Sequence, residues 1–126
     1  MATNETVPQP LKNQRSQDFA SVYANNVSFE PSIWDLKLVF GELDQSSGVI
    51  AQHTSMTIPW SMAKLLMYHL RLNLLSHEIV YGKIAIAQDV IPTEIQPPPE
   101  QFKDNLLFQK VFEVAKKERE EFLKTI

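Results

Sequence analysis

The chain has 126 residues, 44% of them hydrophobic and 21% charged, and a formal net charge of −3. This length and composition indicate one soluble globular domain with a modest core, and the acidic balance disfavours a phosphate-binding surface. Cysteine is absent, which excludes a disulfide framework. The first residues are polar and lack the apolar stretch of a secretory signal, so a cytoplasmic location is expected.

The N-terminal part of the chain changes character at Phe19. Residues 1–18 contain two prolines and almost no large apolar side chain, which predicts a flexible arm. Beyond it, large and small side chains alternate from Tyr23 to Phe29. This period of two predicts a first strand, and Pro31 is expected to end it.

A strand pair follows. In residues 32–43, charged Asp35 and Lys37 alternate with four large apolar side chains that are expected on one face: Trp34, Leu36, Leu38 and Phe40. Residues 44–48 predict a hairpin loop with Gly48 near its end. A third strand, rich in β-branched residues, is expected after it. The order predicts an antiparallel meander.

Residues 58–81 predict one long helix. Thr57 is a suitable N-cap, Pro59 suits the first turn, and Gly82 suits the end. One apolar face is expected to cover the sheet, and a second face is formed by Ala63, Met67, Leu70 and Leu74. Because a small sheet needs only one apolar face, the second is expected to be an interface with another copy.

The same stretch does not predict a membrane span. Lys64, His69, Arg71 and Asn73 interrupt it near the middle. Each charge there costs about 2.5 to 3.5 kcal/mol in a bilayer, so no membrane partner is expected.

The remainder of the chain predicts an extended segment and a second helix. Residues 83–91 suit either a short fourth strand or an extended arm, and the four prolines of 92–100 predict a stiff spacer. Residues 101–126 predict an amphipathic helix, supported by the ion pairs Glu113–Lys117 and Glu120–Lys124. Its apolar stripe is Leu107, Val111, Val114 and Phe122. This stripe is expected either to dock within the oligomer or to bind another protein.

The predicted fold is therefore α+β. A meander of three to four antiparallel strands is followed by one long helix, and a C-terminal amphipathic helix comes after a proline-rich spacer. The predicted parts are a flexible arm at 1–18, a core domain at 19–91, the spacer at 92–100 and the C-terminal helix at 101–126.

The sequence offers little for catalysis. The histidines His53, His69 and His77 lack a partner ligand at helical spacing, so they are expected to be structural and no metal is expected. Only three glycines are present, too few for a phosphate-binding loop, and no nucleophile elbow surrounds Ser46 or Ser47. An enzyme is not expected, nor is a cofactor.

Two resemblances to known families follow from longer patterns. VYANNVSFEPSIWDLKLVFG, together with TIPWSMAKLLMYHLRLNLLSHEIVYGKI, resembles a small bacterial family of unknown function over residues 20–86. The spacer and the C-terminal helix depart from that family. The motif VYANNVSFE, the meander, the proline-started helix and the GKIAI segment are also similar to the bacterial protein-export chaperone SecB. SecB subunits have four strands before their helix, whereas three are predicted here.

These resemblances imply a class of function rather than a substrate. SecB is an acidic, cytoplasmic oligomer that holds unfolded chains in apolar grooves. The expected function is therefore a non-enzymatic, oligomeric, chaperone-like module that binds itself and a polypeptide partner.

Two alternatives stay open. The first is a small nucleic-acid-associated regulator encoded by a phage or an operon, which would lose affinity steeply with salt. The second is an enzyme whose pocket forms only on assembly.

Overall fold

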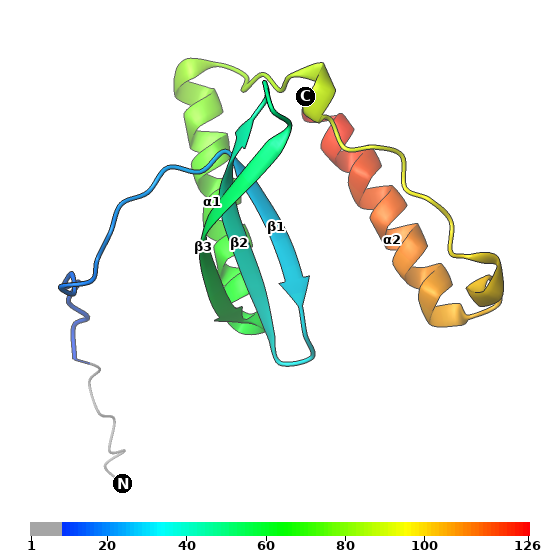
Figure 1. The fold of residues 1–126 in the computed structure, drawn as a ribbon, viewed down its shortest axis with the longest axis horizontal. Helices are drawn as coiled ribbons and strands as arrows, with labels where there is room; N and C mark the ends of the chain where they lie inside the picture. Colours follow the sequence, from blue (N-terminus) through cyan, green and yellow to red (C-terminus); the bar gives the residue numbers. More distant parts are fainter. Residues whose placement is uncertain (1–8) are drawn as a thin grey trace, which may run out of the picture. The chain divides into compact units, whose positions relative to one another are not determined.

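The computed structural model describes residues 9–126 and confirms the α+β fold (Figure 1). Its elements are β1 (Asn26–Pro31), β2 (Asp35–Asp44), β3 (Val49–Pro59), α1 (Trp60–Tyr81), short 3-10 turns at Gln88–Val90 and Glu100–Phe102, and α2 (Leu106–Leu123). No strand forms in residues 83–91, so the sheet of the described chain has three strands. The first eight residues of the predicted arm lie outside the described residues. Residues 9–25 form neither helix nor strand.

Contacts within the chain divide it inside α1. One unit is Met1–Lys64, which contains the sheet and the first residues of α1. The other is Leu65–Ile126, which contains the remainder of α1 and all that follows. The sheet and α2 therefore belong to different units.

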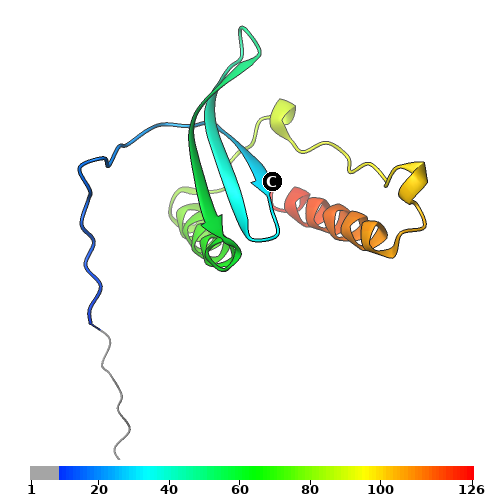
Figure 2. The ribbon, with the colours of Figure 1, turned by 60° about the horizontal axis from the view of Figure 1, so that its bottom comes forward.

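The sheet is the predicted antiparallel meander, in the order β1-β2-β3. Leu38 lies opposite Phe29 on β1 and Met56 on β3, and Leu36 lies opposite Ile58. Because opposite residues share a face, these side chains form one apolar face. Leu38 and Ile58 are the buried large apolar side chains of the described residues, at 8% and 9% exposure. The β2–β3 pair continues well beyond β1 (Figure 2).

Trp34 is not on the apolar face, and that prediction is wrong. The Ser32 hydroxyl accepts hydrogen bonds from the backbone N–H groups of Trp34 and Asp35, at 3.2 and 3.0 Å. These bonds close a turn between β1 and β2, so Trp34 precedes β2 and is 82% exposed. A different tryptophan fixes the turn, because Trp60 Nε1 donates to the Ser32 carbonyl at 3.0 Å.

A β-bulge interrupts the β2–β3 pairing between Phe40 and Gly41. Here the strands approach so closely that a Cβ on Gly41 would lie 2.8 Å from the Ala51 carbonyl oxygen and 3.0 Å from Ile50 Cγ2. The contacting oxygen belongs to the backbone and cannot rotate away. A side chain at position 41 would therefore force the strands apart.

Gly41→Ala is expected to destabilise the sheet by about 1 to 3 kcal/mol, the usual cost of overpacking. Thermal unfolding measures this loss. Gly48→Ala is the matched control, because a Cβ there meets nothing within 4 Å and the cost comes only from its φ of +69°. An equal or smaller loss for Gly41→Ala would contradict the close approach.

The predicted hairpin loop forms at Asp44–Gly48, where the Gly48 N–H donates to the Asp44 carbonyl at 2.8 Å. The Ser46 hydroxyl and backbone N–H donate to Asp44 Oδ1 at 2.6 and 3.0 Å. These bonds hold the pKa of Asp44 below its ordinary value. Since the folded pKa is the lower one, their stabilisation is present above the ordinary carboxyl pKa and is lost as pH falls through the folded value.

Helix α1 begins at Trp60 rather than at Ile58, and Thr57 is not its N-cap. Thr57 pairs with Lys37, and Pro59 with Asp35, so both belong to β3. The strand therefore runs to the residue before the helix. The predicted end is confirmed: Gly82 has a φ of +94°, and its N–H donates to the Glu78 carbonyl at 2.9 Å. Among residues 9–126, no helix is long and apolar enough to cross a membrane.

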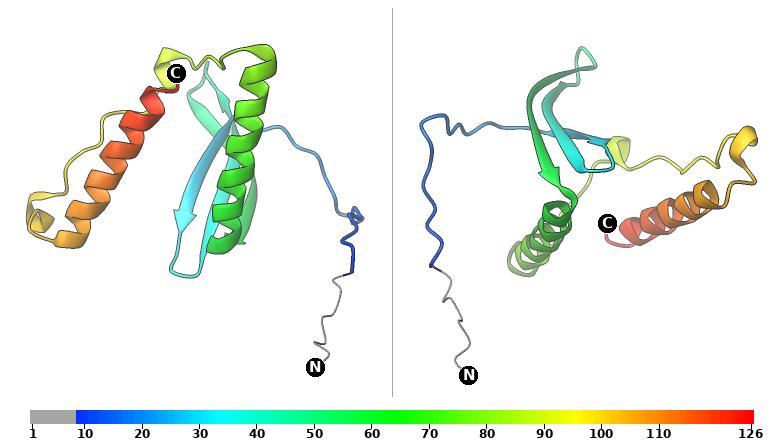
Figure 3. Two further views of the ribbon diagram at one scale, coloured as in Figure 1. Left: turned by 180° about the vertical axis from the view of Figure 1, so that it is seen from behind. Right: turned by 90° about the horizontal axis from the view of Figure 1, so that it is seen from below.

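Helix α2 begins at Leu106, later than the predicted position 101. Asn105 is its N-cap and accepts from the N–H groups of Leu107 and Phe108 at 2.9 and 3.3 Å. Residues 92–99 of the proline-rich spacer form neither helix nor strand, and α2 runs back alongside the spacer (Figure 3). Arg119 Nε donates to the Pro92 carbonyl at 3.0 Å, which ties the helix to the spacer.

The two ion pairs predicted on this helix are absent from the described residues. Lys124 Nζ instead lies 3.3 Å from a carboxylate oxygen of Glu121, one turn away.

Candidate interaction surfaces

The predicted interface residues of α1 lie on an open apolar surface. Met67, Leu70 and Leu74 are 66%, 54% and 50% exposed, and Ala63 is half-buried. No residue on the other apolar face of α1 is buried either.

Two polar side chains of α1 donate hydrogen bonds to the preceding turn of the helix. Asn73 Nδ2 donates to the His69 carbonyl, and the Ser76 hydroxyl donates to the Leu72 carbonyl, both at 2.8 Å. Such bonds to the preceding turn remove the need for water at these groups. The helix can therefore enter an apolar interface with these donors satisfied.

The apolar face of the sheet is covered only in part. Its central residues Leu38 and Ile58 are buried, whereas Val27, Phe29 and Met56 are exposed. The opposite face is polar and carries the Lys37–Glu30 ion pair at 3.8 Å. The sheet thus presents apolar side chains on one face around a small buried centre.

The turn between β1 and β2 forms a third exposed apolar feature. Ile33 is 87% exposed beside Trp34, and the backbone beneath them is held by Ser32. Ile33 was not among the predicted site residues. The serine two residues before Trp34 is the signal that would have placed both side chains in a turn.

Helix α2 has two different apolar faces, and the predicted stripe crosses both. Leu107, Val111 and Val114 are 72%, 67% and 61% exposed, but Phe122 is half-buried. The half-buried face consists of Gln109, Phe112, Ala115, Arg119, Phe122 and Leu123.

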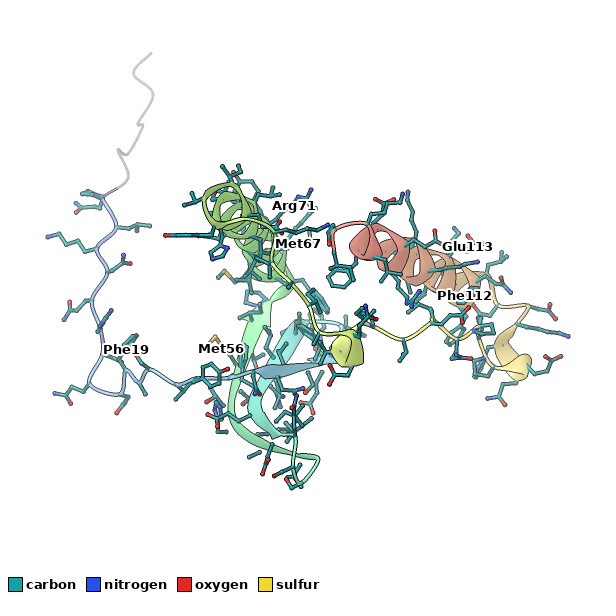
Figure 4. All side chains as sticks on the ribbon, turned by 90° about the horizontal axis from the view of Figure 1, so that it is seen from above. Phe19, Met56, Met67, Arg71, Phe112 and Glu113 are labelled. Carbon is teal, nitrogen blue, oxygen red and sulfur yellow. The ribbon has the colours of Figure 1, made fainter. Side chains whose placement is uncertain are left out.

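The half-buried face includes Phe112, which was not among the predicted stripe residues. Phe112 and its neighbour Glu113 lie on different sides of α2 (Figure 4). The Arg119–Pro92 hydrogen bond shows that this side of the helix meets the spacer. One face of α2 therefore docks on its own chain, and the stripe of Leu107, Val111 and Val114 is left open.

Phe112→Ser is expected to speed amide hydrogen exchange across α2. An isolated helix of this length is only marginally stable in water, and the lost apolar contact is worth about 1.5 kcal/mol, or roughly tenfold in exchange rate. Val111→Ser is the adjacent control and should leave exchange unchanged. A larger effect of Val111→Ser would mean that the open stripe is covered in solution.

No group of three His, Cys, Asp or Glu side chains in residues 9–126 is arranged to hold a metal ion. His53 instead bridges Thr54 Oγ1 at 2.7 Å and the Tyr23 carbonyl at 2.9 Å, which ties the segment before β1 to β3. His69 and His77 contact the rings of Tyr68 and Tyr81 on α1.

Comparison of the chain with protein-family models, with curated proteins and with solved structures finds no match. The resemblances to the bacterial family of unknown function and to SecB therefore stay predictions from the sequence.

Proposed function

We propose that the protein is an oligomeric protein-binding module that holds polypeptide segments against apolar surface. The observation that carries the proposal is the exposure of α1. Twelve of its 22 residues are large apolar side chains exposed by 43% or more. A helix that is apolar around most of its circumference is found buried in soluble proteins, not in contact with water.

The free energy of apolar burial favours self-association as the first step. Burial of one large apolar side chain stabilises by about 1.5 to 3 kcal/mol. The proposed contact has three such side chains from each copy, and the free energy of burying all six is comparable to an association cost of about 4 to 15 kcal/mol. The second face of α1, formed by Ala63, Met67, Leu70 and Leu74, is the proposed contact.

The remaining apolar surface is proposed to hold the polypeptide partner. Phe29 and Met56 offer large side chains on paired strands. Ile33 and Trp34 offer two more on the turn that the Ser32 hydroxyl holds. Aromatic residues on a rigid support are common centres of protein binding. No charged group is required for this contact.

Capture of an unfolded chain tests the proposal. Reduced, carboxymethylated α-lactalbumin stays unfolded and serves as the probe, with its binding measured by fluorescence anisotropy at low and high salt. We expect binding that persists at high salt, because apolar burial does not depend on screened charges. Absence of binding would overturn the proposed function.

A single-stranded oligonucleotide is the matched probe for the nucleic-acid alternative. Binding of the oligonucleotide that falls steeply with salt would favour that alternative.

A further inference from the structure

Strand β3 is an edge strand without the features that usually protect an edge. It has 11 residues, lies at one side of the sheet, and carries no Asp, Glu, Lys or Arg. Its only proline is the last residue, Pro59, and nine of its residues are exposed. Natural edge strands are normally short, charged, interrupted by proline or covered, because open backbone groups pair with other chains.

The outer side of β3 has no partner among residues 9–126. The backbone of Ile50–Ile58 pairs with β2 on one side, and no hydrogen bond joins its other side to the described chain. Side chains do not pair with these outer backbone groups either. The His53 ring bonds to Thr54 Oγ1 and the Tyr23 carbonyl and leaves the backbone groups of β3 free.

The other edge of the sheet is protected. Strand β1 has only six residues, ends in Pro31, and carries Glu30, which pairs with Lys37. A charged, short, proline-terminated strand is a poor template for pairing. The contrast between the two edges singles out β3 as the one available for strand addition.

We infer that β3 pairs antiparallel with β3 of a second copy, forming one continuous six-stranded sheet across a dimer. In a two-fold contact the same strand of each copy faces the other. A charged side chain on that strand would therefore lie near the like charge of the second copy, so a self-pairing strand must lack such charges. β3 meets this condition over its full length. A strand built to select a foreign charged peptide would instead display complementary charge.

The strand is also continuous with the proposed α1 contact. β3 runs to Pro59 and α1 starts at Trp60, with no loop between them (Figures 1 and 2). The same copy can thus supply both an open strand edge and an apolar helix from one stretch of chain. The inference rests on the proposed function only in requiring an oligomer, and it names a different surface.

Disulfide trapping tests the pairing directly. The chain contains no cysteine, so a single introduced cysteine can form a disulfide only with the same cysteine of a second copy. When two antiparallel β3 strands are related by a two-fold axis, one residue of β3 lies opposite the same residue of the second copy. Its Cα atoms would then lie about 4.5 to 5.5 Å apart, within the range that a disulfide bridges. Residues 52 to 56 are each replaced by cysteine and oxidised, with Ser28→Cys on β1 as the control.

We expect the yield of covalent dimer to peak at one position of β3 and to fall at its neighbours, with no dimer for Ser28→Cys.

Light scattering of the unmodified chain runs in parallel. If the chain is an oligomer and no β3 cysteine crosslinks, or Ser28→Cys crosslinks equally well, the inference fails while the proposed function stands. A monomeric chain overturns both. Crosslinking at β3 without capture of unfolded α-lactalbumin overturns the proposed function alone. Trapping blocked by an added peptide would identify a foreign strand as the occupant and overturn self-pairing.

Discussion

Leu70→Glu is expected to convert the protein from an oligomer into monomers. Leu70 lies at the middle of the proposed α1 contact and is 54% exposed in the single chain. In the oligomer, glutamate would be buried without a cationic partner, which costs about 3 to 5 kcal/mol. A penalty of that size raises the dissociation constant by roughly two to four orders of magnitude. Sedimentation across a concentration series measures the shift.

Lys64→Glu is the matched control for this change. It also adds negative charge to α1, but on the polar arc of the helix, where Lys64 is exposed. We expect its dissociation constant to stay close to that of the unmodified chain. Equal weakening by both substitutions would show that net charge, rather than burial of position 70, controls assembly.

Leu38→Ala is expected to cause the largest loss of stability within the sheet. Leu38 is one of two buried large apolar side chains in the described chain, at 8% exposure. Removal of a buried leucine costs about 2 to 5 kcal/mol, a large fraction of a total stability of roughly 5 to 15 kcal/mol. Chemical denaturation followed by tryptophan fluorescence measures the loss, because Trp60 is hydrogen-bonded to the β1–β2 turn.

Met56→Ala is the control for the sheet. Met56 lies opposite Leu38 in the register but is more than half exposed. The loss of stability on Met56→Ala should therefore be smaller, about 1 kcal/mol. A loss at Met56 as large as at Leu38 would contradict the assignment of the buried centre to Leu38. It would mean that an oligomer or a bound chain covers Met56 in solution.

The regular elements could be predicted because their periodicity is local. Alternation through Leu36, Leu38 and Phe40 places all three on the face that the register confirms. The predictions fail where one side chain redirects the backbone. Ser32 closes a turn that removes Trp34 from the strand, and Asn105 caps α2 later than its apolar pattern suggests.

The predicted start of α1 is wrong because of pairing between segments that are distant in the sequence. Thr57 and Pro59 carry helix-start signals, but pairing with β2 keeps both residues in β3. Pairing between distant segments is not visible in a local pattern, so strand pairing overrides the capping preference.

The candidate surfaces were predicted less completely than the fold. The apolar residues of α1 were identifiable because the helix carries more apolar side chains than one face needs. On α2, the stripe through Leu107 and Val111 was found, but Phe112 was missed. Its face becomes apparent only when α2 folds back along the spacer and Arg119 Nε donates to the Pro92 carbonyl. That return path depends on the proline-rich backbone, which has no periodic signal.

We expect the apolar surface of α1 to be covered by another copy of the chain in solution. Light scattering coupled to size exclusion at micromolar concentration tests it most directly. We expect a mass of at least two chains, with each chain contributing 14.5 kDa. A mass of 14.5 kDa for the unmodified protein would contradict it.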